Sequence, residues 1–174
     1  TLDQIENRDA LLNDDGTEAE WPAADVIIGN PPFLGGKRMR DSLGDDGLGR
    51  LFAAYHGLVP PEADFVAYWV AKAWRAISTG SSERAGLVST NSIRDGASRR
   101  VVDPICEDEA LWEAWSDEPW VLEGAAVRVS MVGFGRGFVR RRLNGNEVLK
   151  INADLTSATF DLTKARRLRE NSGV

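Results

Sequence analysis

The sequence DVIIGNPPF at residues 25–33 joins a short apolar run to an abrupt polar and rigid end. An apolar run of this length, bounded by turn residues, is typical of a buried strand. Proline lacks an N–H and has a fixed φ, so Pro31 and Pro32 cannot continue a strand ladder. We therefore expect Asn30 and the two prolines just past the carboxyl end of a strand, with the aromatic ring of Phe33 beside them.

An amide, rigid carbonyl groups and an aromatic face in succession suit the binding of a flat ring that carries an amine. The alternative interpretation is an ordinary turn, because Asn-Pro and Pro-Pro are common turn signals. The apolar strand pattern directly before Asn30 favours binding over a bare turn.

The four residues Asn30-Pro31-Pro32-Phe33 resemble the catalytic NPPF or NPPY motif of amino-methylating DNA methyltransferases, in particular the adenine-specific group. These enzymes use S-adenosyl-L-methionine. The resemblance implies that the Asn30 side-chain oxygen and the Pro31 carbonyl each accept one N–H of the target amine. It implies that Pro32 helps to hold those carbonyls in set directions, and that Phe33 stacks on a base flipped out of the duplex.

Residues 5–12 resemble the third motif of the same family. The resemblance implies that Asp9, at a strand end, accepts a hydrogen bond from the adenine amine of bound S-adenosyl-L-methionine. The alternative is a solvated cap or turn, which is the usual role of an aspartate at a strand end. The short spacing between Asp9 and the NPPF strand favours the cofactor role.

The segments after the motif follow the order found in this family. Apolar residues at three- and four-residue spacing predict an amphipathic helix over residues 63–78, which ends at residues 79–82. Residues 85–92 predict a short strand with a polar tip, and residues 125–134 predict a buried strand. The aromatic residues of the helix are expected in the core.

The resemblance implies an α/β fold, a Rossmann-like class I methyltransferase sheet that is incomplete. The family's strand order is 3-2-1-4-5-7-6, of which strands 4-5-7-6 are present, whereas the cofactor-loop strands 1 and 2 are absent. Nothing before Asp9 supplies the expected glycine-rich turn. Strand 3, near residues 2–7, would lack its partner, so we expect residues 1–12 to be poorly anchored and strand 4 to be an exposed edge.

Two parts are expected along the chain: a partial catalytic domain over residues 1–142 and a connector over residues 143–174. The connector begins with a hairpin-like turn at Asn144-Gly145. We expect it to lead toward a missing target-recognition domain. The missing N-terminal and recognition parts are expected from the same polypeptide, and the isolated fragment is expected to be inactive.

The composition fits one α/β domain, with 174 residues of which 43% are apolar. Cys106 is the single cysteine, which excludes an internal disulfide and fits a reducing cytoplasm. With one cysteine and one histidine, a protein metal site is not expected. The sequence shows no secretory signal and no apolar run long enough for a membrane span, so we expect a cytoplasmic protein.

Charge is unevenly distributed along the chain. Residues 1–35 contain eight acidic residues against Arg8, whereas residues 36–174 carry a net charge of +1. Lys37 and Arg38 follow the NPPF motif and could meet DNA phosphates from a mobile glycine-containing loop. The alternative is a solvated loop, since the overall net charge is −6.

We therefore expect a site-specific DNA methyltransferase of the restriction–modification type. It would transfer a methyl group from S-adenosyl-L-methionine to the exocyclic amine of a flipped adenine in double-stranded DNA. Related motifs keep three other targets open: the amine of cytosine in DNA, guanine in RNA, and the amide of a protein glutamine. A further alternative is a non-catalytic half-domain that only binds a partner.

Overall fold

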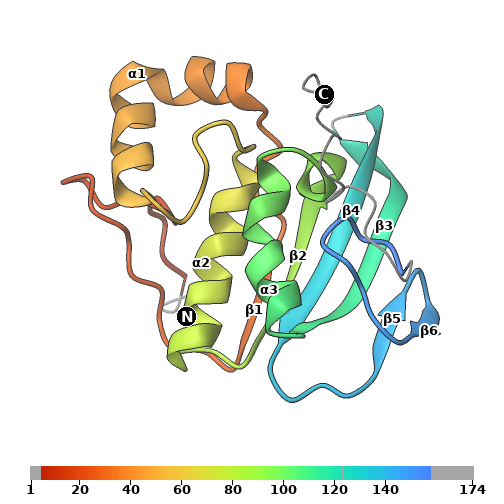
Figure 1. Cartoon of the computed structure of the whole chain (residues 1–174). Helices are drawn as coiled ribbons and strands as arrows, with labels where there is room; N and C mark the ends of the chain where they lie inside the picture. The colour runs from red at the N-terminus through yellow and green to blue at the C-terminus, as the bar shows by residue number, and fades with distance from the viewer. Residues whose placement is uncertain (1–4, 123, 158–174) are drawn as a thin grey trace, which may run out of the picture.

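A mixed β-sheet forms one layer of the molecule, and helices form the other (Figure 1). The computed structural model describes residues 5–122 and 124–157, apart from the side chain of Leu122. Among these residues the sheet has six strands in the order β1-β2-β4-β3-β5-β6. The strands are β1 (Val26–Gly29), β2 (Arg84–Thr90), β3 (Leu111–Leu122), β4 (Ala125–Gly135), β5 (Arg141–Leu143) and β6 (Asn146–Val148).

The sheet combines parallel and antiparallel pairs. β1 and β2 are parallel, with Ile27 opposite Ala85, whereas β4 runs antiparallel to both β2 and β3. The order β1-β2-β4-β3 corresponds to the family's 4-5-7-6, so this part of the prediction is confirmed. β5 pairs in parallel with β3, and β6 pairs with β5, so these short strands extend the sheet beyond the expected set.

The helix predicted over residues 63–78 is confirmed as α2 (Val66–Thr79), which lies against the sheet beside β1 and β2 (Figure 1). Most of its apolar residues are buried, as the spacing predicts, whereas Trp69, Trp74 and Ala76 are half-buried. Gly80 ends the helix with a φ of 84°, and its N–H donates to the Ile77 carbonyl.

The mobile loop predicted around Lys37 and Arg38 is instead the first turn of a helix, α1 (Gly36–Ala54). The sequence of this helix is rich in glycine and has few apolar residues, so its periodicity is weak. Gly44 interrupts it with a φ of 67°. The buried residues that hold α1 to the rest of the protein are Met39, Leu48 and Leu51.

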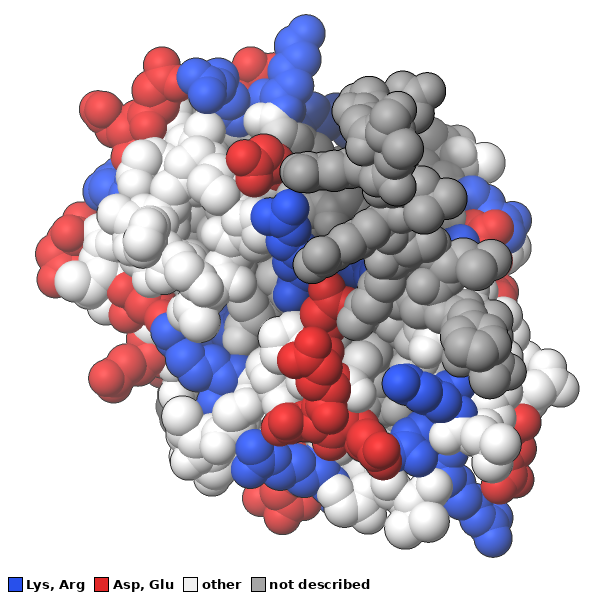
Figure 2. Space-filling view, in the orientation of Figure 1, with Lys and Arg blue, Asp and Glu red and all other residues white. Residues whose placement is uncertain are grey.

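Three short helices connect β2 to β3: η1 (Asn91–Arg94), η2 (Ser98–Val101) and α3 (Asp103–Glu107). Acidic side chains gather over α3 near the middle of the view, and basic side chains are interspersed with acidic ones elsewhere on this face (Figure 2). The described part of this face therefore has mixed charge.

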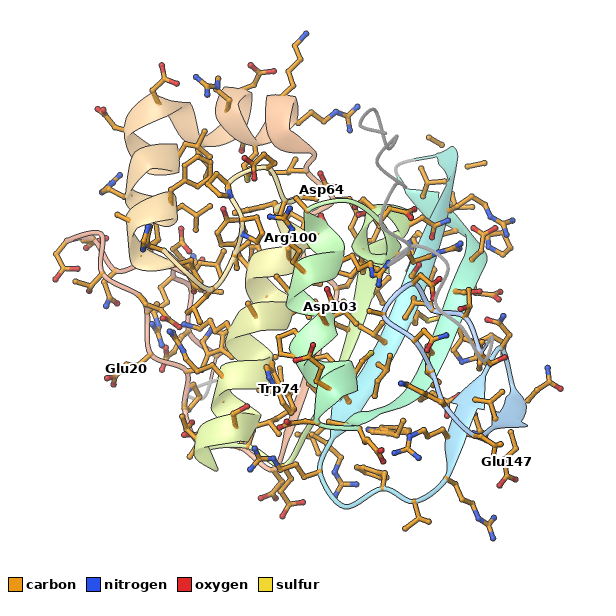
Figure 3. All side chains as sticks on the ribbon, in the orientation of Figure 1. Glu20, Asp64, Trp74, Arg100, Asp103 and Glu147 are labelled. Carbon is orange, nitrogen blue, oxygen red and sulfur yellow. The ribbon has the colours of Figure 1, made fainter. Side chains whose placement is uncertain are left out.

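The core lies between the helices and one face of the sheet. Trp74 points from α2 toward the sheet, and its ring centroid lies 6.4 Å from that of Phe134 on β4 (Figure 3). Tyr55 and Tyr68 pack edge to face at 5.2 Å. Edge-to-face packing of this kind adds specificity to the area that the rings bury.

The opposite face of β1 is uncovered among the described residues. Ile28 is 84% exposed and Val26 is 42% exposed, whereas Ile27 between them packs against the core. β1 also lies at the end of the sheet. The expectation that this strand is an exposed edge is confirmed.

The expectation that residues 1–12 are poorly anchored is wrong for residues 9–12, while residues 1–4 lie outside the described part. Leu11 is only 1% exposed, and its carbonyl accepts a hydrogen bond from the Tyr55 hydroxyl at 3.2 Å. These residues pack against the helices, so they need no neighbouring strand. Residues 5–7 form no strand.

The expected turn at Asn144-Gly145 is confirmed, with φ values of 51° and 77° that suit a two-residue hairpin. The described part of the expected connector, residues 143–157, packs against the rest of the protein. Ile151 and Leu155 are buried in the core. Residues 158–174 lie outside the described part, and the boundary at residue 142 stays a prediction.

No helix among the described residues is long and apolar enough to cross a membrane. The same residues contain no group of three or more His, Cys, Asp or Glu side chains that could hold a metal ion.

Candidate functional site

The carboxyl end of β1 carries the motif predicted to be catalytic. Asn30, Pro31 and Pro32 follow Gly29 directly, and β2 ends at the same edge because the two strands are parallel. Pro31 is buried, Phe33 is half-buried, and Asn30 is exposed. The prolines end the strand as predicted, and the Asn30 amide is left accessible to a ligand.

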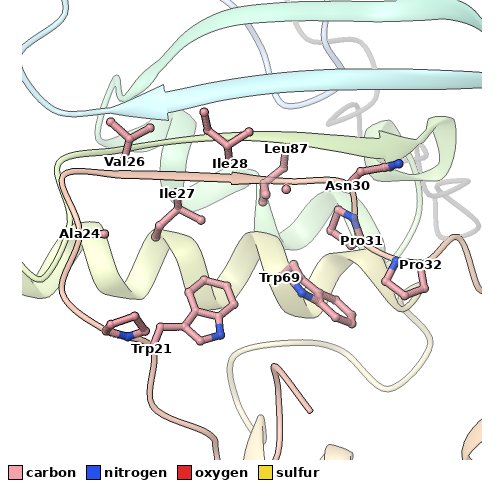
Figure 4. Close-up of a pocket in the computed structure, with 12 residues that line it drawn as sticks. Trp21, Ala24, Val26, Ile27, Ile28, Asn30, Pro31, Pro32, Trp69 and Leu87 are labelled. Carbon is pink, nitrogen blue, oxygen red and sulfur yellow. The ribbon is translucent and has the colours of Figure 1, made fainter. Parts of the chain in front are cut away.

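A cavity of about 390 Å³ opens beside this strand end (Figure 4). The indole rings of Trp21 and Trp69 lie on the same side of β1 as Ile27, while Asn30 and Pro31 lie at the end of the strand. Apart from the indole nitrogens, Asn30 supplies the only polar side-chain group among the described lining residues. Two flat apolar rings and one amide suit a planar ring compound.

The position of Trp21 is set by buried contacts. Its indole N–H donates to the Ala10 carbonyl at 2.7 Å, and Lys72 Nζ lies 4.8 Å from its ring centroid. Lys72 Nζ also donates to the Ala19 carbonyl, and it pairs with Glu18 at 3.2 Å. Burial, and then the positive charge of Arg8, lower the pKa of Lys72 to about 8.

Asp9 lies next to this wall but outside the residues that line the cavity. Its Oδ1 accepts hydrogen bonds from the backbone N–H groups of Leu11 (2.7 Å) and Leu12 (3.1 Å). This is the local turn that the alternative interpretation describes. The cofactor role of Asp9 stays a prediction, and Oδ2 is the oxygen that it would use.

Lys37 and Arg38 are exposed in the first turn of α1, a few residues after the motif. The amino end of a long helix favours anions because its first N–H groups lack partners within the helix. The two side chains are therefore accessible to a phosphate, and that role stays a prediction.

Sequence reasoning missed the two indole rings that form the cavity wall. Trp69 was expected in the core, and its ring does pack edge to face on Phe65 at 4.7 Å. It also lines the cavity, so it serves both purposes. The spacing of apolar residues in a helix predicts which face is buried. It does not show which residues of that face also line a cavity. Trp21 precedes the strand in an irregular segment, where no periodicity marks it.

The protein family described as "MmeI, DNA-methyltransferase domain" matches residues 4–143. The chain belongs to this family. The match includes every site residue predicted from the sequence, from Asp9 to Arg38. No match to the chain is found among the curated proteins.

One solved structure agrees with membership of the MmeI methyltransferase family. The type IIL restriction-modification enzyme MmeI in complex with DNA has a similar structure, with a TM-score of 0.59 and 26% identity. The similarity covers 77% of this chain and 20% of that one, so this chain spans about a fifth of the enzyme's length. The fold is therefore that of restriction-modification methyltransferase domains, as the sequence predicts.

A second solved structure is more distant. It is the methyltransferase subunit of a type I restriction-modification system from Streptococcus thermophilus, with 14% identity and a TM-score of 0.45. The similarity covers 71% of this chain and 27% of that one.

Proposed function

We propose that this chain takes part in methyl transfer from S-adenosyl-L-methionine to the exocyclic amine of an adenine flipped out of double-stranded DNA. The observation that carries the proposal is the Asn30-Pro31 pair at the end of β1, beside a cavity with two indole walls. Family membership supports DNA methyl transfer as the reaction class. The similar enzyme MmeI was solved in complex with DNA, which supports DNA as the substrate.

Asn30 and Pro31 act on the target amine in this proposal. An exocyclic amine is a poor nucleophile because its lone pair is delocalised into the ring. The Asn30 side-chain oxygen and the Pro31 carbonyl each accept one N–H, which favours a tetrahedral nitrogen with an available lone pair. Phe33 stacks on the extruded base, a contact worth about 1–3 kcal/mol, and Pro32 keeps the backbone direction fixed.

The cavity fits the cofactor by its chemistry. S-adenosyl-L-methionine supplies an electrophilic methyl group when bound. Trp21 and Trp69 offer flat apolar walls for its adenine ring, in a cavity of about 390 Å³. In this proposal Asp9 accepts a hydrogen bond from the adenine amine of the cofactor. Asp9 is next to Ala10, whose carbonyl accepts the indole N–H of Trp21 in the cavity wall.

Methylation by the complete protein tests this proposal. Radiolabelled S-adenosyl-L-methionine is incubated with DNA, and the labelled nucleoside is identified after digestion. Label on the adenine amine is the expected result. Label on cytosine, or label found in RNA or protein instead, would reject adenine as the target. Cofactor binding without any transfer would favour the non-catalytic half-domain.

Titration of S-adenosyl-L-methionine into the 174-residue chain is a separate test. It asks whether cofactor binding needs the cofactor-loop strands that we expect this chain to lack. If the cofactor loop is needed from outside this chain, calorimetry should detect no binding. Clear binding would show that Trp21, Trp69 and their neighbours hold the cofactor without that loop.

A further inference from the structure

β3 is interrupted by a bulge at Ser116 and Asp117, which have no paired residues on β4. A bulge bends its strand and re-aims the side chains beside it. The Ser116 carbonyl accepts hydrogen bonds from the Ser130 hydroxyl and from Arg94, both at 2.9 Å. The bulge is therefore held from β4 on one side and from η1 on the other.

Asp117 ties this bulge to the end of β2. Its Oδ1 accepts from Arg128 Nε at 2.8 Å and from the Asn91 amide, and its Oδ2 pairs with Arg128 Nη2 at 2.8 Å. Asn91 follows β2 directly, and its side-chain oxygen accepts from the Ser130 hydroxyl at 3.0 Å. The bond from Arg128, and then that from Asn91, lower the pKa of Asp117 to about 2. We call Asn91, Asp117, Arg128 and Ser130 the bulge cluster.

The bulge cluster lies at the base of an arm made by the β3–β4 hairpin. Thr90, the last residue of β2, is opposite Val129, while β4 begins earlier, at Ala125. At about 3.3 Å per residue, the hairpin extends about 13 Å beyond the end of β2. β1 ends at the same edge, so the arm projects from the end of the sheet that carries Asn30 (Figure 1).

The arm presents apolar surface beyond the strand ends. Trp120 is half-buried, and Val121 is 72% exposed. Asp117 helps to hold the direction of the arm relative to β2, because this carboxylate is bonded both to Arg128 on the arm and to Asn91 at the strand end. The bonds of Arg94 and Ser130 described above act beside it.

We propose that Asp117 is a positioning residue for the methyl transfer. Through its two partners it fixes the angle of the arm, and so places Trp120 against the target nucleotide, while Val121 points to the opposite face of the arm. This inference rests on the proposed function. Both Asp117 and Arg128 are exposed, at 44% and 53%, so removing the carboxylate charge loosens the arm and leaves the core intact.

Asp117→Asn in the complete protein is the test. We expect kcat/KM for DNA to fall roughly tenfold or more, because small displacements of positioning groups slow catalysis strongly. The dissociation constant for S-adenosyl-L-methionine and the melting temperature should stay unchanged. Amide hydrogen exchange over residues 118–121 and 125–128 should become faster. Exchanging the charges, Asp117→Arg with Arg128→Asp, should restore part of the rate.

Asp108→Asn is the matched control. Asp108 forms a similarly exposed ion pair with Arg136 at 3.5 Å, near the opposite end of β4. This variant should change neither the rate nor exchange in the arm. The inference is overturned if Asp117→Asn leaves arm exchange unchanged, or if faster exchange leaves kcat/KM for DNA unchanged. A wild-type protein that transfers no methyl group to DNA rejects the proposed function itself, and the inference fails with it.

Discussion

The two sides of the β1 end are held by different kinds of contact. On the α2 side, the cavity wall depends on Lys72, which is 4% exposed and bonded to Glu18 and the Ala19 carbonyl. On the hairpin side, the arm depends on the exposed pair of Asp117 and Arg128. Leaving a buried polar group unpaired is costly, whereas an exposed ion pair contributes little to stability.

Because of this difference, substitutions on the two sides of the site should affect different properties of the protein. Changes in the cavity wall should lower the free energy of unfolding along with cofactor affinity. Changes in the bulge cluster should alter turnover on DNA while the fold stays intact. Asn30 lies between the two sides and is exposed, so its contribution should be to chemistry alone.

Asn30→Ala should have the largest effect. We expect the methylation rate of the complete protein to fall by about 10²–10³-fold, the usual result of removing one hydrogen-bonding group that acts in the transition state. The melting temperature should not change, because Asn30 is exposed. Single-turnover methylation and thermal unfolding measure the two quantities. Asn146→Ala, an exposed control in β6, should change neither the methylation rate nor the melting temperature. Retained turnover in Asn30→Ala would reject the role of the amide.

Lys72→Met tests the cavity wall. The variant keeps the apolar stem but removes the donor to Ala19 and Glu18, so we expect a loss of about 1–3 kcal/mol in the free energy of unfolding. Cofactor affinity should fall as well, because Trp21 loses the cation beside its ring. Urea unfolding and calorimetry measure these effects, with the exposed Lys150→Met as the control. An unchanged free energy of unfolding would mean that the lost hydrogen bonds are offset by the removed cost of burying the ammonium group. If cofactor affinity were unchanged as well, the wall would be held by packing alone.

The same lysine should leave a signature in the pH dependence of stability. Burial lowers the pKa of Lys72 from 10.5 to about 8 in the folded protein. Between these values the unfolded chain binds more protons, so this group raises stability as the pH increases. Burial raises the pKa of Tyr55 and Tyr68 above 10.0, which lowers stability at higher pH. The rise between pH 8 and pH 10 should disappear in Lys72→Met.

Phe33 should affect substrate binding more than cofactor binding. Loss of the stacking ring in Phe33→Ala should weaken DNA binding by about 1–3 kcal/mol per stacked base. Phe33→Tyr and Phe33→Trp keep an aromatic face and should retain most of the activity. Fluorescence titration with DNA containing an extruded base analogue measures the effect. An equal loss for Phe33→Trp and Phe33→Ala would show that shape, and not stacking, matters at this position.

The sequence predicted β1, β2 and β4 because each contains an apolar run bounded by turn residues. It did not mark β3, which carries many polar residues and was expected only from the resemblance, and residues 5–7 form no strand. It predicted α2 from the spacing of apolar residues, but it missed α1, whose glycines weaken the periodicity. Gly44 also breaks that helix with a positive φ. Local patterns therefore identify elements that bury a continuous face, and they fail for an element held by a few buried residues.

The motif at Asn30 was identified because its residue types are unusual in sequence. The cavity beside it was not, since Trp21 and Trp69 are far apart along the chain and meet only in the fold. The bulge at Asp117 was also not predictable, because strand register depends on the partner strand as well as on the residues themselves. Groups brought together by tertiary structure are the part that sequence reasoning could not supply.

Two neighbouring residues of β1 offer the finest comparison, because they point to opposite faces of one strand. Ile27→Thr should lower the free energy of unfolding by about 1–2 kcal/mol, since a hydroxyl replaces apolar contacts with the core. Ile28→Thr should change it by less than about 0.5 kcal/mol, because a substitution at an exposed position is normally silent. Urea unfolding of the two variants measures the difference. If Ile28→Thr were as costly as Ile27→Thr, the exposed face of β1 would have to be covered in solution, and the contrast between its two faces would disappear.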